Sequence, residues 1–406
     1  MPRVRAEDLS PTRRTAAFAT LMIFEFFYGW CWNTVDILRP QIRDALGLTL
    51  TQAGSAYTAQ GLGAMTGAIV LGQLADRFGR TRMIYVVVIG YGGLAAAGLL
   101  VASYPALMVQ RAALGFFLGG NFPIIVGSYL GLFPPHLRGK LTSVSNGCHN
   151  FAIVALGASL SATWLPADWR FLLLAGAVPP LLLSPLLAIV PDDRRIAVWG
   201  ADGAQTGALR NLPIADLFAP GLIGITVRLF LVIGLNFFAY QAFAGWVTTY
   251  LRDVRGFSVA EVGSIVAWQF AGATLGSFFW GWVADRFGRR AAAYGFFGGT
   301  LVVILYLGAV RSPDMLRLAG FIWGFMIACS VAWGPWMAEL FPVHLRSTAM
   351  SIFNWGRLIS MTAPLITGAV AARFGLTWAM ALSAACFLIA GKVWLSLPET
   401  LIRKAP

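Results

Sequence analysis

The 406-residue chain is 58% hydrophobic and only 12% charged, about half the charged share of an ordinary soluble domain. Its formal net charge of +13 comes from basic residues in short segments between long apolar runs, which excludes the broad basic face of a nucleic-acid-binding domain. The four cysteines lie far apart inside apolar runs and lack metal-ligand spacing, which indicates buried free thiols. The apolar runs are about 20 residues long, the length of a membrane-crossing helix, so the composition predicts a polytopic membrane protein.

Taken in chain order, the apolar runs predict twelve helical spans and therefore an all-α membrane protein. The spans expected in the first half are 16–38, 52–74, 83–103, 106–130, 141–163 and 169–190. Those expected in the second half are 220–250, 259–283, 291–310, 315–340, 348–372 and 377–397. The predicted domains are an N-terminal six-helix half at 1–190, a cytoplasmic central loop at 191–218 and a C-terminal six-helix half at 219–406.

A charged loop motif occurs twice between apolar runs. The first loop motif reads GQLADRFGR at Gly72–Arg80, and the second reads GWVADRFGR at Gly281–Arg289, a step of 209 residues. Another pair, PPHLR at 134–138 and PVHLR at 342–346, repeats at a step of 208 residues. A nearly constant offset of half the chain indicates a duplicated unit, so we expect two six-helix halves in parallel orientation.

The basic residues predict the orientation of the chain. Most loop Lys and Arg residues lie on the side of the two loop motifs. The positive-inside rule makes that side cytoplasmic, and an even number of spans puts both termini there as well. We therefore expect an integral protein of the plasma (cytoplasmic) membrane with both termini in the cytoplasm.

These signatures resemble those of the major facilitator superfamily over essentially the whole chain. Both loop motifs are similar to the family's G-x-L-a-D-r-x-G-r signature, and Arg111–Gly119 is similar to its span-4 Arg/Gly pattern. Pro135–Gly139, Glu339–Arg346 and Pro398–Thr400 resemble motifs of the sugar porters. The resemblance implies the major facilitator fold, with twelve helices in two six-helix pseudo-repeats around a central cavity, and transport by alternating access.

Within the superfamily, one branch is the most similar. Arg346–Met350 and the downstream Arg357 resemble the aromatic-acid:proton symporters and other organic-ion transporters akin to the sugar porters. The first span departs from that pattern, because Tyr28–Trp32 stands where the branch carries an aspartate. The acids of this span are instead Glu25 and Asp36.

Charged side chains inside membrane spans are costly and usually face the bundle interior. Asp36 in span 1 and Arg111 in span 4 lie at similar depth, and the resemblance implies that these spans are neighbours. We therefore expect an Asp36–Arg111 pair in which protonation of Asp36 releases Arg111 to attract an anion; a solvated Asp36 is the alternative. Glu25 lies deep in span 1 and is the second candidate for proton coupling, with a structural hydrogen bond as its alternative. Tyr240 and Gln241 in span 7 are further candidate substrate contacts.

A basic position recurs in spans 5 and 11. His149 and Arg357 are 208 residues apart, and each follows an asparagine by three residues, Asn146 and Asn354. Residues at i and i+3 share a helix face, and an amide beside a guanidinium is suited to binding a carboxylate. His149 is also a candidate proton carrier, because imidazole changes charge near neutral pH. Structural ties to neighbouring helices are the alternative for both residues.

The loop motifs have a predicted mechanical role as a gate latch. A carboxylate at the end of span 2 can cap a facing helix N-terminus between the halves, and neighbouring ion pairs must break when the cytoplasmic side opens. Gly131 stands in the first half where Glu339 stands in the second. A charge cluster that only sets topology is the alternative. The predicted latch residues are Asp76, Arg77, Arg80, Asp285, Arg286, Arg289, Glu339 and Arg346.

The charges in the spans predict a secondary active transporter that imports a small organic anion, a carboxylate, together with protons by alternating access. An exporter of apolar compounds, a symporter of sugars or other neutral solutes, and a non-transporting membrane sensor are the alternatives. An enzyme is not expected, because His136, His149 and His344 accompany no nucleophile or metal cluster. We expect no cofactor or metal, a proton gradient as the energy source, the lipid bilayer as surroundings, no nucleic-acid partner and a monomer.

Overall fold

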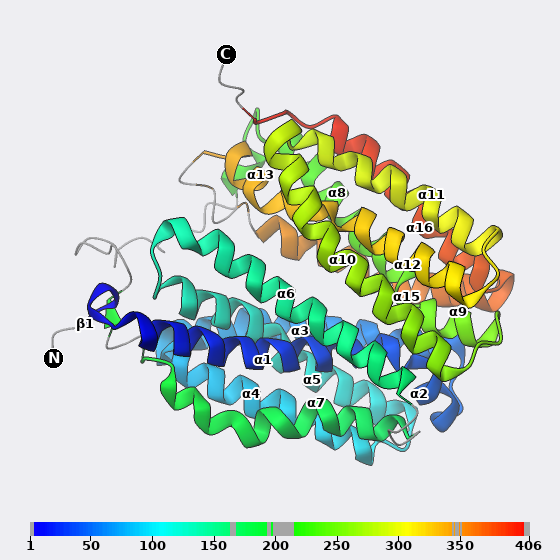
Figure 1. Ribbon diagram of the computed structural model, residues 1–406, viewed down its shortest axis with the longest axis horizontal. Coiled ribbons are helices and arrows are strands. Elements are labelled where there is room, and N and C mark those ends of the chain that lie inside the picture. The colour runs from blue at the N-terminus through cyan, green and yellow to red at the C-terminus, as the bar shows by residue number, and fades with distance from the viewer. Residues whose placement is uncertain are drawn as a thin grey trace. The chain divides into compact units, whose positions relative to one another are not determined.

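The computed structural model describes residues 4–162, 168–192, 196–197, 215–342, 345, 349 and 351–401. These residues are almost entirely helical (Figure 1), which confirms the predicted all-α class. The chain divides into two compact units: the first contains Met1–Leu48, Ser55–Ser159 and Thr163–Ala208, and the second contains Thr49–Gly54, Leu160–Ala162 and Leu209–Pro406. Much of the predicted central loop at 191–218 lies outside the described residues.

The helices of the first half follow the predicted order. They are α1 (Pro11–Ile37), α2 (Arg39–Leu46), α3 (Leu50–Phe78), α4 (Arg80–Ala97), α5 (Tyr104–Leu130), α6 (Pro135–Ser161) and α7 (Trp169–Leu183). Short 3-10 helices are η1 (Ala6–Asp8), η2 (Gly98–Leu100) and η3 (Ser184–Ile189). Two strands of two residues each, β1 (Val4–Arg5) and β2 (Ile196–Ala197), pair in parallel and join the N-terminal segment to the central connection.

The second half repeats this order of helices. Its α-helices are α8 (Ile223–Phe243), α9 (Val247–Asp253), α10 (Val259–Phe287), α11 (Tyr294–Gly308), α12 (Pro313–Ile327), α13 (Trp333–Leu340), α15 (Ser351–Phe374) and α16 (Leu376–Leu395). Its 3-10 helices are η4 (Ala215–Phe218), η5 (Arg290–Ala293) and η6 (Ala328–Ala332).

Helix ends in both units follow from local chemistry. The side chain of Ser10 caps α1 ahead of Pro11, and Ser258 forms a capping box with Glu261 at the start of α10. Gly79 and Gly288 occupy the same place in the two loop motifs and end α3 and α10 with φ angles of 95° and 115°. Such positive φ angles favour glycine, which accounts for the glycine at this position in both copies of the motif.

Small residues let equivalent helix pairs pack closely in both units. A Cβ atom added to Gly67 of α3 would lie 1.7 Å from the carbonyl oxygen of Phe116 on α5. A Cβ atom added to Gly276 of α10 would lie 2.3 Å from the carbonyl oxygen of Phe325 on α12. These glycines are 209 residues apart in sequence and so are their partners, so the sequence repeat is also a repeat of helix contacts.

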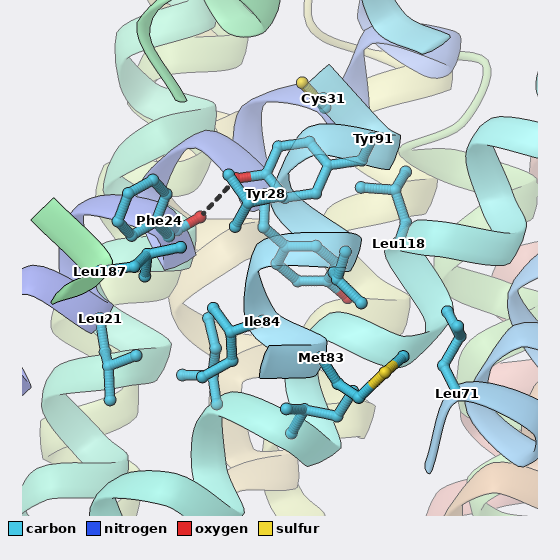
Figure 2. Packing of buried hydrophobic residues seen from close by; sticks show 14 of the residues in the cluster. Leu21, Phe24, Tyr28, Cys31, Leu71, Met83, Ile84, Tyr91, Leu118 and Leu187 are labelled. Atoms are coloured by element: carbon cyan, nitrogen blue, oxygen red, sulfur yellow. Dashed lines mark hydrogen bonds between the residues drawn. The ribbon is translucent and has the colours of Figure 1, made fainter. Parts of the chain in front are cut away.

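A buried apolar cluster fixes α1 within the first unit (Figure 2). Phe24 from α1, Ile84 and Tyr91 from α4, and Leu118 from α5 belong to this cluster, and the Tyr91 hydroxyl donates a hydrogen bond to the Phe24 carbonyl over 3.3 Å. This packing sets the position of the next residue in the chain, Glu25.

Eight segments of the described chain are long and apolar enough to cross a membrane: Arg80–Leu100, Tyr104–Leu130, Trp169–Ile189, Ile223–Asp253, Val259–Phe287, Arg290–Gly308, Pro313–Met337 and Leu376–Leu395. The long helices α1, α3, α6 and α15 do not reach that apolarity. They carry Glu25, Gln60, His149 and Arg357, and polar residues of this kind are found on helices that face a bundle interior. That all twelve predicted spans cross the membrane stays a prediction.

Candidate functional site

Three helices of the first unit bring polar side chains around Glu25. Glu25 on α1 is only 1% exposed, and one of its carboxylate oxygens accepts a hydrogen bond from Nδ2 of Asn121 on α5 over 3.2 Å. Nδ1 of His149 on α6 lies 4.0 Å from the other carboxylate oxygen. The structure therefore joins Glu25 and His149, which the sequence predicted as separate candidates.

Close packing between α1 and α6 holds His149 beside Glu25. A Cβ atom on Gly29, one turn after Glu25, would lie 2.9 Å from the carbonyl oxygen of His149 and 3.1 Å from its Nδ1 atom. The ring of Tyr28 lies 5.4 Å from the imidazole, measured between ring centres. The glycine and the aromatic ring thus define a narrow slot in which the imidazole sits.

A second polar group forms around Arg111 of α5, which is 2% exposed. Its Nη1 atom donates to the hydroxyl of Thr34 over 3.2 Å and to the side-chain oxygen of Gln60 over 3.4 Å. Gln60 in turn donates to the carbonyl of Trp32 over 2.9 Å. Arg111 thereby ties α5 to α1 and α3 through neutral acceptors, and its buried Nε atom has no hydrogen-bond partner among the described residues.

The partner of Asp36 differs from the predicted one. Asp36 forms a buried ion pair with Arg39, three residues further along the chain, whereas Arg111 bonds to Thr34 and Gln60. The structure forms an Asp36–Arg39 ion pair in place of the predicted Asp36–Arg111 pair, because Arg39 starts α2 directly beyond α1 and is itself buried, at 1% exposure. Asp36 still acts on Arg111 electrostatically. The i, i+3 spacing of acid and base was the available signal, but Arg39 lies just beyond the predicted span 16–38.

The second unit holds the other predicted binding residues. The guanidinium carbon of Arg357 on α15 lies 5.7 Å from the ring centre of Phe237 on α8, within cation–π range. On the same helix α8, the Tyr240 ring lies 6.0 Å from that of Trp323 on α12, and Gln241 is buried. The side chain of Asn354 lies outside the described residues, and Asn146 in the first unit is exposed on α6.

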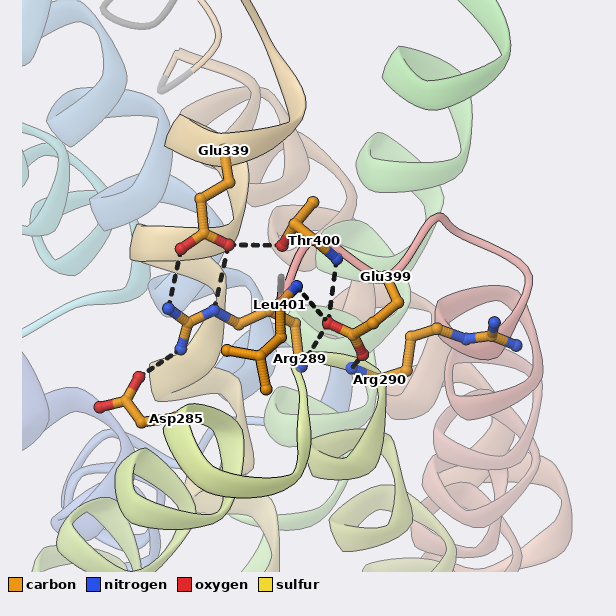
Figure 3. Close-up of polar contacts among 7 residues, drawn as sticks. All are labelled: Asp285, Arg289, Arg290, Glu339, Glu399, Thr400 and Leu401. Atoms are coloured by element: carbon orange, nitrogen blue, oxygen red, sulfur yellow. Dashed lines mark hydrogen bonds and ion pairs between the residues drawn. The ribbon is translucent and has the colours of Figure 1, made fainter. Parts of the chain in front are cut away.

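The second loop motif is the centre of a hydrogen-bonded network (Figure 3). Arg289 forms ion pairs with Asp285 at 2.5 Å and with Glu339 at 2.8 Å, and its Nε atom donates a further bond to Glu339 at 3.2 Å. Thr400 donates its hydroxyl to Glu339. Because Arg289 donates hydrogen bonds to the carboxylate of Glu339, the pKa of Arg289 stands above its ordinary value, against the opposing effect of burial.

Glu399, just beyond α16, caps the start of η5 in this network. Its carboxylate oxygens accept the backbone N–H groups of Arg289 and Arg290, each over 2.9 Å. Burial acts to raise the pKa of Glu399, but the backbone N–H groups of Arg290, Leu401, Arg289 and Thr400 outweigh it and hold the pKa below its ordinary value. The sequence included Glu399 in a family motif but assigned it no role.

The described contacts of the first loop motif include two hydrogen bonds to backbone carbonyls. Arg80 donates from Nη1 to the backbone carbonyl of Gly127 on α5 over 2.9 Å, and Thr81 donates its hydroxyl to the carbonyl of Pro191 over 3.0 Å. Arg77 is exposed, with its guanidinium 5.4 Å from the ring centre of Phe78.

Not all predicted latch residues can be placed in these contacts. Arg286 is exposed and does not take part in the network around Arg289. The side chain of Asp76 and the whole of Arg346 lie outside the described residues. The latch role itself stays a prediction.

Comparison with known proteins gives consistent matches along the chain. A family model described as Major Facilitator Superfamily matches residues 21–267 and 229–405. The 3-(3-hydroxy-phenyl)propionate transporter of Escherichia coli is 29% identical over 95% of this chain and 94% of its own length. The gallate transporter of Pseudomonas putida is 26% identical over 90% of this chain and 89% of its own.

Solved structures agree with the fold. The inward-facing crystal structure of a bacterial homolog of the human lysosomal transporter Spinster superposes with a TM-score of 0.81 at 16% identity, over 96% of this chain and 97% of that one. The inward-open xylose transporter of E. coli gives a TM-score of 0.74 at 17% identity, over 95% and 97% of the two chains. At such identities, the likeness establishes the fold alone.

Proposed function

The chain belongs to the Major Facilitator Superfamily and is a secondary transporter rather than an enzyme; from this premise we propose that it imports a small organic carboxylate together with protons. Relatives along nearly the whole chain are named as transporters of 3-(3-hydroxy-phenyl)propionate and gallate. Both of these compounds carry a carboxylate on an aromatic framework. An aromatic acid is accordingly the substrate class that we propose first.

The observation that carries the proposal is the charge of Arg111. This guanidinium is buried in a membrane helix, and its described hydrogen-bond partners, Thr34 and Gln60, are neutral. Asp36 acts on this guanidinium electrostatically but forms its ion pair with Arg39. An arginine fork matches a carboxylate in geometry and charge, so a substrate carboxylate would bind Arg111 directly.

Arg357 is the second proposed anion-binding residue. It is half-buried on α15 with the ring of Phe237 near its guanidinium. A cation next to an aromatic face is suited to an aromatic acid, because the carboxylate can bind the guanidinium while the substrate ring packs on aromatic neighbours. Tyr240 and Gln241 on α8 are proposed as further substrate contacts.

The coupling ion and the orientation belong to the same proposal. Glu25 and Asp36 are the membrane-embedded carboxyl groups, and we propose that a proton gradient across the cytoplasmic membrane drives uptake through them. The loop basic residues support cytoplasmic termini, and we expect the protein to work as a monomer that needs no bound cofactor.

Uptake into proteoliposomes tests the proposal. We expect wild-type protein to accumulate 3-(3-hydroxyphenyl)propionate or gallate when the outside is acidic, and to leave xylose outside. Arg111→Gln should lower uptake about ten- to a hundredfold, since a charge-assisted bond is worth about 1.5–3 kcal/mol and each 1.4 kcal/mol is tenfold. Arg373→Gln, which changes an exposed arginine of α15, is the matched control. Uptake of xylose, or acid uptake that ignores the pH gradient, would contradict the proposal.

A further inference from the structure

The carboxylate of Glu25 lies where a lone negative charge is costly. It is almost fully buried next to the apolar cluster of the first unit, and Asn121 is its hydrogen-bond donor. Within the described chain, His149 is the one basic side chain that reaches within 4.0 Å of it. A neutral amide alone does not balance a buried carboxylate, so the charge of Glu25 depends on a proton or on the imidazole.

The other titratable groups around Glu25 come from three helices. They are Tyr91 of α4, Tyr129 of α5 and Cys148 of α6. Tyr91 donates its hydroxyl to the Phe24 carbonyl and Tyr129 donates to Thr142, so neither phenol is directed to the carboxylate. Phenols and thiols stay protonated at neutral pH, which leaves His149 as the neighbour whose charge changes there.

Asn121 has the chemistry to serve Glu25 in both of its protonation states. In the structure its Nδ2 atom donates to the carboxylate, while its buried Oδ1 atom has no hydrogen-bond partner among the described residues. A protonated Glu25 would need an acceptor instead of a donor. Rotation of the amide by about half a turn presents Oδ1 to the carboxyl O–H, because an amide offers donors on one side and an acceptor on the other.

His149 links the buried carboxyl group of Glu25 to the surface of the first unit, so that a proton can reach it. Its side chain is 26% exposed, whereas that of Glu25 is 1% exposed. Gly29 keeps the imidazole next to α1, since a side chain there would collide with the backbone of His149. A proton taken up at the imidazole is therefore one short transfer from the carboxylate.

We propose that Glu25 and His149 form one proton-binding unit, with Asn121 positioning the carboxyl group and His149 as the member through which the proton enters. This inference rests on the proposed proton symport and replaces the substrate-binding role that the sequence repeat with Arg357 gave to His149. The step moves one proton from the imidazolium to the carboxylate, so charge shifts within the pair and no other bond changes.

Two transport assays separate this inference from the function on which it rests. In proteoliposomes, we expect Glu25→Gln to lose uptake driven by a pH gradient but to retain exchange of labelled for unlabelled substrate, which needs no net proton movement. His149→Gln should lower gradient-driven uptake about tenfold or more and retain exchange, since it removes the proton donor but not the substrate contacts. Asn150→Ala, on the next residue of α6, is the control and should match wild type.

The transport results decide separately on the proposed function and on the proton-binding unit. If wild type shows no acid uptake at all, the proposed function fails. If wild type is driven by the gradient and either Glu25→Gln or His149→Gln is driven equally well, the proton-binding unit is overturned. If His149→Gln loses gradient-driven uptake and exchange together, His149 is a substrate ligand and the inference is also overturned. Should these variants not fold, Gly29→Ala moves α6 from α1 without changing a titratable group, and unchanged gradient-driven uptake in it would contradict the inference.

Discussion

The two loop motifs share a sequence and a turn, but one position beside the arginine that ends each motif differs between the two units. Arg289 in the second motif bonds two carboxylates, Asp285 and Glu339. Arg80, at the equivalent place in the first motif, bonds the backbone carbonyl of Gly127. The difference follows from the fact that Gly131 occupies the position equivalent to Glu339. The turn is thus the same in both units, whereas the carboxylate of Glu339 has no counterpart in the first unit.

The buried polar residues also differ between the two units, and here the charged residue belongs to the first unit. In the first unit, Arg111 donates to Gln60. In the second, the equivalent positions, 209 residues later, hold Gly320 and Gln269. Gln269 is fully buried, and both polar atoms of its side chain lack hydrogen-bond partners within the described residues. The buried arginine of the first unit and its bond to Gln60 therefore have no counterpart at these positions of the second unit.

The largest effect should come from breaking the second network at its centre. Arg289→Ala leaves Glu339 without its main partner, and the charged hydrogen bonds lost are worth about 2–3 kcal/mol together, with the exposed Asp285 contributing little. Arg80→Ala breaks the bond to the Gly127 carbonyl, worth about 1 kcal/mol, and leaves no counterpart of Glu339 behind, because Gly131 stands at that position. Thermal unfolding in detergent, followed by tryptophan fluorescence, should show the larger fall in Tm for Arg289→Ala; equal shifts would mean that the two motifs are held alike.

A smaller effect should come from the Glu399 cap, and it should depend on pH. The folded protein holds the pKa of Glu399 below its ordinary value of 4.5, so the cap stabilises the fold fully above that pH. As the pH falls through the lowered pKa, the stabilisation is lost. Glu399→Gln should cost about 0.5–1 kcal/mol at pH 7, a value kept modest by solvent exposure of the carboxylate.

The effect of Glu399→Gln can be checked by measuring Tm against pH for wild type and for the variant. As the pH falls below 4.5 and through the lowered pKa of the folded protein, the Tm difference between wild type and Glu399→Gln should narrow, because protonation removes the charge that the substitution also removes. Glu261→Gln, at the capping box of α10, provides a comparison outside the loop motifs. A Tm difference that stays constant well below pH 4.5 would show that the charge of Glu399 is not what stabilises this helix start.

The repeat and the apolar runs were enough to predict the helical class and the order of the helices, and the loop motifs show why glycine recurs where each turn needs it. Those features depend on local and periodic signals: glycine where φ is positive, apolar stretches of fixed length, and equal offsets between motifs. The family and the class of function also followed, because doubled motifs are specific to a superfamily.

The partners inside the site could not be predicted in the same way. Asp36 forms its ion pair with Arg39 because the chain turns into α2 directly after α1, and a hydropathy pattern does not show that turn. His149 lies next to Glu25 because Gly29 lets α6 approach α1. This contact joins segments about 120 residues apart in the sequence. Side-chain pairing across helices depends on helix rotation and packing, which one sequence without an alignment does not reveal.

The smallest effect, and the sharpest test of the comparison, should come from adding to the first unit a carboxylate at the position of Glu339. Gly131 ends α5 with φ of −70°, a conformation open to any residue, so Gly131→Glu adds a carboxylate without backbone strain. If the units are equivalent, the new side chain pairs with Arg80 as Glu339 pairs with Arg289, and a partly exposed pair is worth about 0.2–1 kcal/mol. Gly131→Gln controls for helix propensity, and the double variant Gly131→Glu with Arg80→Ala isolates the pair energy. A Tm gain in Gly131→Glu that persists without Arg80 would show that the first motif differs from the second in geometry as well as in charge.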